Sequence, residues 1–348
     1  MINVRLANHL DNKKWDDYVL AHENAGPYHL FAWKKAIEAE YGHSTYYFIA
    51  QDKDGNTTGV LPLVNVKPPL CKATLVSQPF CDYGGILASN EESAKLLLEN
   101  AIELARLINA KIEIRCTEQE IFLDSSLALN PVSNKTRMIL ELPDTSAQLW
   151  DSFKSKLRSQ IRRPQKDGLN FELGTFDKIE DFYQVFCHNM RDLGSPVHAK
   201  SFIKAVIKEF SENIKVGVVY KDRVPLAAGI ILMCGKTVSI PWASSLREYN
   251  RFSPNMLLYW EFLEYACEKD FSHFDFGRST PGEGTYKFKE QWGAQPRPLY
   301  WYKEGSPHRK KTELTDGKAR ELIEKVWAKI PLSIVNYLGP SLRKYITL

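Results

Sequence analysis

The order of predicted helices and strands repeats in the two halves of this sequence, and this repetition limits the fold more than any other feature. Each half begins with helical periodicity, continues with two strands joined by a turn, and ends with a helix and a strand. In the first half these are helices at 13–21 and 29–41, strands at 45–51, 57–66 and 73–79, a helix at 91–109 and a strand at 110–116.

The second half has the same order of elements. It contains helices at 177–192 and 199–211, strands at 214–220, 224–235 and 236–245, a helix at 254–269 and a strand at 272–277. The two halves share almost no sequence identity, so the matching order indicates an old duplication. We therefore predict a mixed α/β (α+β) protein with domains at 1–145 and 146–305 and a helical C-terminal tail at 306–348.

The composition is that of a globular protein with a large core. The chain has 348 residues, of which 44% are hydrophobic, and a length that favours two domains. The net charge of +4 is small for this size, which argues against an extended nucleic-acid surface. Anion binding is therefore expected only at local clusters of basic residues.

Cysteine spacing and hydropathy indicate a cytoplasmic protein without a metal site. The six cysteines are scattered and form no C-x-x-C pair, as expected of reduced thiols. The N-terminal segment has no apolar signal region, and the longest apolar run, at 226–235, is too short to span a bilayer.

The segment 274–293, FDFGRSTPGEGTYKFKEQWG, contains two apparent nucleotide motifs. Asp275 to Gly277 is a D-F-G triplet, and Gly277 to Gly282 has P-loop glycine spacing. The kinase interpretation fails because no glycine-rich loop, strand lysine or H-R-D segment comes before the triplet. The P-loop fails because Glu283 stands where a lysine should meet the phosphates.

The end of this segment predicts a short helix from Thr285 to Trp292, with Thr285 as its N-cap and Gly293 after its end. Helical spacing places Phe288 and Trp292 on one face as anchors. Tyr286 and Lys289 share another face, which can present a phenol and an ammonium to a substrate.

A lysine beside an aromatic anchor and a glycine-rich loop is suited to stabilise the negative charge that develops in acyl transfer. Lys289 and Tyr286 are therefore candidate catalytic residues. The alternative is that Lys289 is an ordinary surface lysine. Arg278, in the glycine-rich stretch, is a candidate phosphate contact.

Several segments together resemble Fem-type (FemAB-related) acyltransferases, especially the subgroup associated with exosortase and exopolysaccharide systems. The resemblance covers most of residues 15–303, and it is carried by the segments LVSQPFCDYGGILA, FKSKLRSQIRRPQKDGL, NMRDLGSPVH and SPNMLLYWEFLEYACEKDFSHFDFGRSTPGEGTYKFKEQWGAQPRPLYW. The resemblance implies two tandem GNAT-like domains. It also implies transfer of an acyl or aminoacyl group to an amine of a cell-envelope precursor, such as a peptidoglycan or exopolysaccharide precursor carried on a nucleotide-linked or lipid-linked sugar.

The resemblance also assigns roles to individual residues. Lys289, which follows Phe288, would steady the acyl-transfer intermediate or the phosphates of the acceptor, and Arg191 would bind an acceptor phosphate or carboxylate. The donor would be a substrate, acyl-CoA or aminoacyl-tRNA, with no tightly bound cofactor. The chain lacks the coiled-coil arm that some Fem enzymes insert for tRNA, which weighs against the tRNA donor.

A basic stripe in the segment 153–163 is a further candidate site. Lys154, Arg158 and Arg162 follow one another at helical spacing beside an apolar stripe. This arrangement could hold a pyrophosphate, with Arg158 as the strongest candidate, or it could be a solvated helix face.

The start of the helix at 254 is another candidate anion site. Ser253 suits the N-cap and Pro254 the first helical position, and helix N-termini attract anions. Asn255 and Tyr259, one turn apart, are therefore candidate substrate-binding residues.

The first half offers three candidates. Trp33 and Lys35 lie on one predicted helix and are candidate substrate contacts. Asp82, beside two glycines, is a candidate general base for an attacking amine, although a turn aspartate is the alternative.

Two alternatives stay open for the position of the tail, and two for the function of the whole chain. The tail is either docked on the core or in peripheral contact with the inner face of the membrane. The chain is either an N-acyltransferase or a non-catalytic GNAT-like scaffold that binds an envelope precursor or a biosynthetic partner.

Overall fold

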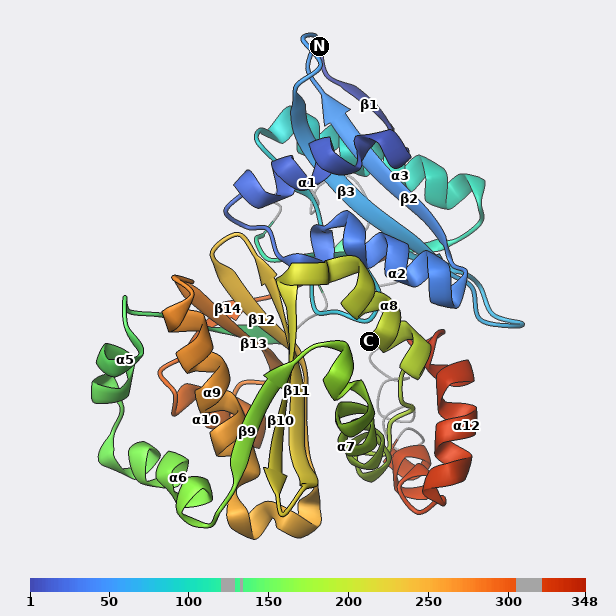
Figure 1. The fold of residues 1–348 in the computed structure, drawn as a ribbon. Helices are drawn as coiled ribbons and strands as arrows, with labels where there is room; N and C mark the ends of the chain where they lie inside the picture. Colours follow the sequence, from blue (N-terminus) through green and yellow to red (C-terminus); the bar gives the residue numbers. More distant parts are fainter. Residues whose placement is uncertain (120–128, 132–133, 305–320) are drawn as a thin grey trace. The chain divides into compact units, whose positions relative to one another are not determined.

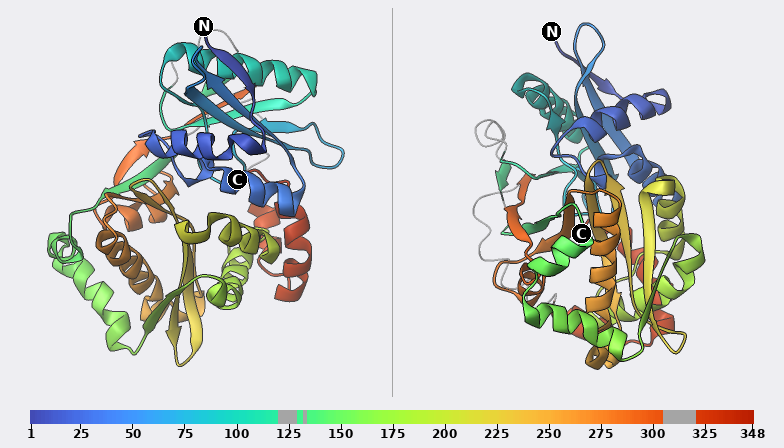
Figure 2. Two further views of the ribbon diagram at one scale, coloured as in Figure 1. Left: turned by 45° about the horizontal axis from the view of Figure 1, so that its top comes forward. Right: turned by 60° about the vertical axis from the view of Figure 1, so that its left-hand side comes forward.

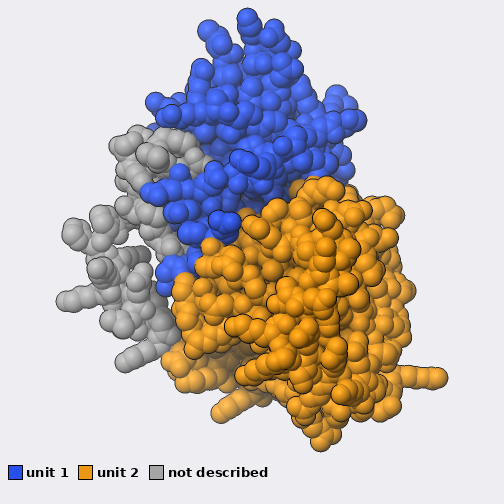
Figure 3. Space-filling model, turned by 90° about the vertical axis from the view of Figure 1, so that its left-hand side faces the viewer, with its two compact units in different colours: residues 1–136, 297–310, 345–348 blue, residues 137–296, 311–344 orange. Residues whose placement is uncertain are grey.

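The computed structural model describes residues 1–119, 129–131, 134–304 and 321–348. The chain forms two compact units, shown in different colours in Figure 3. Unit 1 combines Met1–Thr136 with Arg297–Lys310 and Tyr345–Leu348, and unit 2 combines Arg137–Pro296 with Lys311–Lys344. Neither unit is a single continuous segment. The domains expected from the sequence, 1–145 and 146–305, are each continuous.

Unit 1 is built on a twisted sheet with the strand order β1-β2-β3-β4-β6-β15-β7, and β5 pairs with β3. The strands are β1 (Asn3–Leu6), β2 (Ser44–Gln51), β3 (Thr57–Val66), β4 (Thr74–Val76), β5 (Leu87–Ala88), β6 (Lys111–Cys116), β7 (Leu129–Pro131) and β15 (Tyr300–Glu304). Its helices are α1 (Asn12–Ala21), α2 (Phe31–Tyr41) and α3 (Glu91–Leu107). Figure 2 shows these helices against the sheet, and α3 contributes the buried stripe Leu97, Leu98 and Ala101 to the core.

Unit 2 contains the second sheet, with the order β14-β8-β13-β12-β11-β10-β9. The strands are β8 (Thr136–Glu141), β9 (Asn170–Gly174), β10 (Ile214–Lys221), β11 (Val224–Cys234), β12 (Thr237–Ser245), β13 (His273–Ser279) and β14 (Gln295–Pro298). The helices are α5 (Ser146–Ser152), α6 (Ser155–Lys166), α7 (Ile179–Asp192), α8 (Lys200–Phe210), α9 (Pro254–Glu268), α10 (Gly284–Glu290) and α12 (Leu332–Arg343). Helices α7 and α9 cover opposite faces of this sheet (Figure 1).

The predicted repetition is confirmed by the two sheets. Each has an antiparallel hairpin, β2–β3 in one and β10–β11 in the other. Each also has one parallel pair joined through a helix, β4 with β6 through α3 and β12 with β13 through α9. Two paired parallel strands need a crossover connection between them, and a helix provides it in both sheets.

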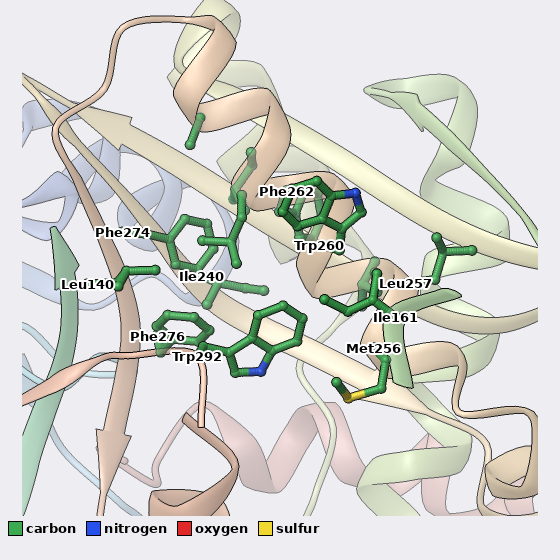
Figure 4. Close-up of a cluster of buried hydrophobic side chains, with 14 of the residues drawn as sticks. Leu140, Ile161, Ile240, Met256, Leu257, Trp260, Phe262, Phe274, Phe276 and Trp292 are labelled. Atoms are coloured by element: carbon green, nitrogen blue, oxygen red, sulfur yellow. The ribbon is translucent and has the colours of Figure 1, made fainter. Parts of the chain in front are cut away.

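The core of unit 2 lies between α9 and the sheet (Figure 4). Phe262 of α9 is fully buried over Gly217 and Gly229, which face each other on β10 and β11. A Cβ atom at Gly217 would lie 2.7 Å from the Phe262 ring, so the sheet needs glycine here for α9 to approach.

Two expected helix starts differ in detail. The helix expected from Thr285 begins one residue earlier, at Gly284, and ends at Glu290, because the chain after it forms tight turns up to Gly293, whose φ is 93°. Ser253 does precede α9, but its φ is 52° and its side chain makes no capping hydrogen bond. Pro254 therefore fixes the start of α9 without help from the serine hydroxyl.

The D-F-G triplet has a structural role. Both Nε and Nη2 of Arg137 donate to the Asp275 carboxylate, at 3.1 and 2.8 Å, and the backbone N–H of Gly277 donates to its other oxygen at 2.8 Å. Asp275 therefore ties β13 to β8 and shapes the end of the strand, where Gly277 takes a φ of 74°.

Candidate functional site

The candidate site lies where the pairing of two parallel strands stops. β12 and β13 pair only over Thr237–Ser239 and His273–Asp275, although β12 continues to Ser245 and β13 to Ser279. The end of β12, which no longer pairs with β13, lines a pocket of about 270 Å³ together with the start of α9 and helix α10. The lining residues are Asn189, Ala243, Ser244, Ser245, Asn255, Leu258, Tyr259, Gly284, Thr285, Phe288 and Lys289.

Four residues predicted from the sequence meet in this pocket. Asn255 and Tyr259 come from α9, and Phe288 and Lys289 come from α10. Their grouping depends on the parallel pair, because α9 connects β12 to β13 and α10 follows β13 directly.

Lys289 is held firmly at the wall of the pocket. Its ammonium donates to the backbone carbonyls of Gly277 and Arg278, at 3.1 and 2.8 Å, and the residue is only 8% exposed. The alternative of an ordinary surface lysine is therefore wrong. These two hydrogen bonds fix the position of the Lys289 side chain at the pocket wall.

Aromatic rings form a rigid wall behind the lysine. Tyr259 stacks on Phe276 with ring centroids 5.6 Å apart, and its edge meets Phe288 at 5.0 Å. Phe288 in turn contacts Trp292, so the predicted anchoring face of α10 is present. Trp292 is fully buried in the core of unit 2 (Figure 4). These contacts fix the orientation of α10 and, with it, the position of Lys289.

The phenol of Tyr259 is a hydrogen-bond donor at neutral pH. Burial raises its pKa above the ordinary value of a tyrosine, so the group stays protonated. With the Lys289 ammonium, the Asn255 amide and the Thr285 hydroxyl, it gives the pocket donors suited to an oxyanion.

The sequence did not single out Asn189 or Ser244. Asn189 of α7 donates to the Ser244 hydroxyl of β12 at 3.0 Å, and both side chains line the pocket. The available signal was the position of Asn189 at the start of NMRDLGSPVH, two residues before Arg191. Nothing local in the sequence links it to Ser244, 55 residues away.

The other predicted residues of unit 2 lie outside the lining of this pocket. Tyr286 packs against the hydrophobic core, and Arg191 at the end of α7 pairs with Asp192 at 2.7 Å. Arg158 lies 3.8 Å from Asp151 and is partly exposed. Arg278 contributes its carbonyl oxygen to Lys289, as described above.

The basic stripe around α6 has a different setting. Lys154 precedes the helix as its N-cap, and Arg162 lies over the Trp150 ring at 5.0 Å. Lys154 and Lys156 line a separate groove of about 770 Å³, together with Phe153, Leu157 and Trp292 among others. The stripe therefore does not converge on the pocket that contains Lys289.

Three candidates belong to unit 1. Trp33 is fully buried, and its indole donates to the Pro79 carbonyl at 3.3 Å, which makes it a core residue with no surface to offer a substrate. Lys35 is exposed on α2. Asp82 is half-buried, and its backbone carbonyl accepts a hydrogen bond of 2.9 Å from Trp301.

The lining of the pocket favours charge stabilisation over proton transfer. Among the described residues that line it, none carries a carboxylate or an imidazole. In the same described part of the chain, no group of three His, Cys, Asp or Glu side chains is arranged to hold a metal ion. Fixed hydrogen-bond donors around a small cavity are what a tetrahedral acyl-transfer intermediate requires.

The fold is that of GNAT proteins, with two GNAT-like domains in tandem. Residues 151–290 match the family model of the acetyltransferase (GNAT) domain, and this range contains every residue that lines the pocket. The predicted fold and the resemblance to Fem-type proteins are thus confirmed at the level of the fold.

Solved structures with this fold include FemX, with a TM-score of 0.68 at 16% identity, covering 92% of this chain and 100% of that chain. The C-terminal domain of a putative lysylphosphatidylglycerol synthetase from Agrobacterium fabrum matches with a TM-score of 0.57 at 14% identity, over 91% of this chain and 97% of that chain. A tandem GNAT protein from the clavulanic acid biosynthesis pathway matches with a TM-score of 0.57 at 11% identity, over 88% and 99%. Among curated proteins, none matches this chain in sequence.

Proposed function

We propose that this protein is an N-acyltransferase that transfers an acyl group from acyl-CoA to an amine. The observation that carries the proposal is the small pocket at the end of β12, which Lys289, Tyr259 and Asn255 line together. The GNAT domain match over residues 151–290 supports acyl-CoA as the donor.

In the proposed reaction, the neutral amine attacks the thioester carbonyl and forms the new C–N bond. The carbonyl oxygen becomes an oxyanion, which Lys289 and Tyr259 stabilise by charge and by a hydrogen bond. When the tetrahedral intermediate collapses, the C–S bond breaks and the CoA thiolate takes up the proton that the amine has lost. Positioning and charge stabilisation thus supply the catalysis, with no metal in any step.

The acceptor in this proposal is an amine of a cell-envelope or exopolysaccharide precursor, carried on a nucleotide-linked or lipid-linked sugar. The similarity in fold to a putative lysylphosphatidylglycerol synthetase, whose name points to a lipid acceptor, supports the lipid-linked alternative. Arg191, Arg158 and Arg278, all in unit 2, are the proposed contacts to acceptor phosphates. The reaction would take place in the cytoplasm, at the inner face of the membrane for a lipid-linked acceptor.

The test is mass spectrometry of amino-sugar acceptors after incubation with the protein and acetyl-CoA. The expected result is an acceptor heavier by one acetyl group, together with release of free CoA. A second arm replaces acetyl-CoA with aminoacyl-tRNA, and a product in that arm alone would assign the other donor. No mass shift with either donor, across nucleotide-linked and lipid-linked amino sugars, would contradict the proposal.

A non-catalytic scaffold is the second candidate, and the lack of a carboxylate or imidazole among the described lining residues is the observation that favours it. Calorimetry separates the two functions. An enzyme of the proposed kind binds acetyl-CoA, whereas a scaffold binds the sugar precursor alone.

A further inference from the structure

Helix α12 is docked on unit 2 through one narrow face. Val335, Gly339 and Arg343, spaced four residues apart, are buried. A Cβ atom at Gly339 would lie 3.1 Å from the backbone nitrogen of Val197, so the glycine allows close contact. This face accounts for the docking of the helix, because residues four apart lie on one side of an α-helix.

Four apolar side chains of α12 are exposed beside the buried face. Tyr337 is 82% exposed, and Ile334, Leu338 and Leu342 are each more than 40% exposed. The last three are spaced four residues apart and form one stripe along a flank of the helix, and Tyr337 lies beside this stripe. A contiguous apolar stripe of this kind on a protein surface marks an interaction site.

The charged residues near this stripe indicate which kind of partner it binds. Asp and Glu make up 42 of the 348 residues, yet none occurs between Lys325 and Leu348. The basic residues Lys329 and Lys344 lie just beyond the two ends of α12. An apolar stripe with lysines at its ends complements a bilayer with anionic head groups, where lysines meet phosphates and apolar side chains enter the acyl boundary.

We propose that the exposed apolar stripe of α12, formed by Ile334, Tyr337, Leu338 and Leu342, binds the surface of an anionic bilayer, with the helix axis in the plane of the interface. The aromatic ring of Tyr337 suits the level of the head groups, where tyrosine is enriched in membrane proteins. Insertion across the bilayer is not part of the proposal, since no helix in the described ranges is both long and apolar enough to span one. This contact is independent of acyl transfer and can be tested without substrate.

The test is flotation of the full chain with vesicles of phosphatidylcholine alone and of phosphatidylcholine with phosphatidylglycerol. Binding to the anionic vesicles is expected, with little binding to the neutral ones and loss of binding in high salt. The double variant Tyr337→Asp/Leu338→Asp is expected to lower the partition coefficient at least tenfold. Lys329→Gln should lower it about fivefold, in proportion to one lost charge near the surface.

The matched control is Leu107→Asp, because Leu107 is 81% exposed at the end of α3 in unit 1, away from the charge pattern described above. This variant should bind vesicles as the parent does, and circular dichroism should show that all variants are folded. Equal binding by the parent and the double variant would overturn the proposal. A parent that ignores both vesicles but forms a dimer, which the double variant abolishes, would assign the face to protein association instead.

Discussion

Lys289 is buried, and its position is fixed by the end of β13. Its ammonium donates to the carbonyls of Gly277 and Arg278, which lie at that end of the strand. The residue therefore fixes the strand end and lines the pocket at the same time. A charge held by backbone groups does not have to reorganise during a reaction, which is the basis of electrostatic catalysis.

Removing this side chain should reduce turnover far more than it reduces folding. Lys289→Ala is expected to lower kcat by about 100-fold or more, as the loss of an oxyanion contact does elsewhere. Lys287→Ala is the matched control, because Lys287 is exposed on the same helix, and it should keep the parent rate. Steady-state kinetics with acetyl-CoA gives the measurement, and an unchanged kcat in a folded Lys289→Ala protein would exclude the assigned role.

Glu261 should make stability depend on pH. Burial first, and then the neighbouring Glu264 and Glu268, raise the pKa of Glu261 from 4.5 to about 7. The folded state therefore holds this proton more tightly than the unfolded chain, so stability is highest below pH 4.5 and falls as the pH rises toward 7.

The variant Glu261→Gln should remove this fall. Because water reaches part of the side chain, the gain in unfolding free energy at pH 8 is expected to be about 1–2 kcal/mol, with little change at pH 4. Urea unfolding at the two pH values measures it. Glu290→Gln, at an exposed position of α10, is the comparison, because Glu290 is not one of the glutamates that raise the pKa of Glu261. Equal gains at both pH values would show that packing, and not proton binding, is responsible.

At the scale of elements, the approach of α9 to the sheet depends on the glycine pair of β10 and β11. Gly217 and Gly229 face each other across the hairpin, and the ring of Phe262 occupies the space that their missing side chains leave. Since α9 carries Asn255 and Tyr259, the depth of this packing also sets one wall of the pocket.

Gly217→Ala should therefore destabilise the protein by about 1–3 kcal/mol through overpacking. Its added methyl group would lie 2.6 Å from the Phe171 ring and 2.7 Å from the Phe262 ring. Gly284→Ala is the matched control, since a Cβ atom there meets nothing within 4 Å. Thermal unfolding distinguishes the two, and equal midpoints for both variants would argue against the packing explanation.

At the scale of the whole molecule, the ends of the chain return to unit 1. Strand β15 pairs with β6 in the first sheet, and the last four residues also belong to unit 1. Arg115 is 1% exposed, and its guanidinium donates to Glu113, to the Cys81 carbonyl and to Thr347. The C-terminal residues thus satisfy a buried charge of the N-terminal half.

Deletion of 345–348 should destabilise unit 1 by about 2–4 kcal/mol, because Arg115 and the Phe80 N–H would both lose Thr347 as a partner. Thr347→Val keeps the backbone contacts and removes one hydroxyl acceptor, so its expected cost is about 1 kcal/mol. Chemical unfolding of both variants is the measurement. A truncated chain as stable as the parent would mean that solvent can replace these contacts.

Much of the fold could be predicted because periodicity and capping are local properties of the sequence. A continuous apolar run after a turn identified β3 at 57–66, and Pro254 identified the first residue of α9. Helical spacing also identified Phe288 and Trp292 as the anchors of α10. The strands β8, β9, β14 and β15 were not predicted, since they are short and their pairing partners lie far away in the chain.

The sequence by itself determined the repeated order of elements, the aromatic anchors and the candidate residues Asn255, Tyr259 and Lys289. Only the tertiary structure decided that these residues share one pocket, that Asn189 and Ser244 join them, and that the carbonyls of β13 hold the lysine. The physical reason is that helices and strands follow from contacts between near neighbours. A pocket is formed by side chains that are brought together only when the β-sheet and its covering helices pack.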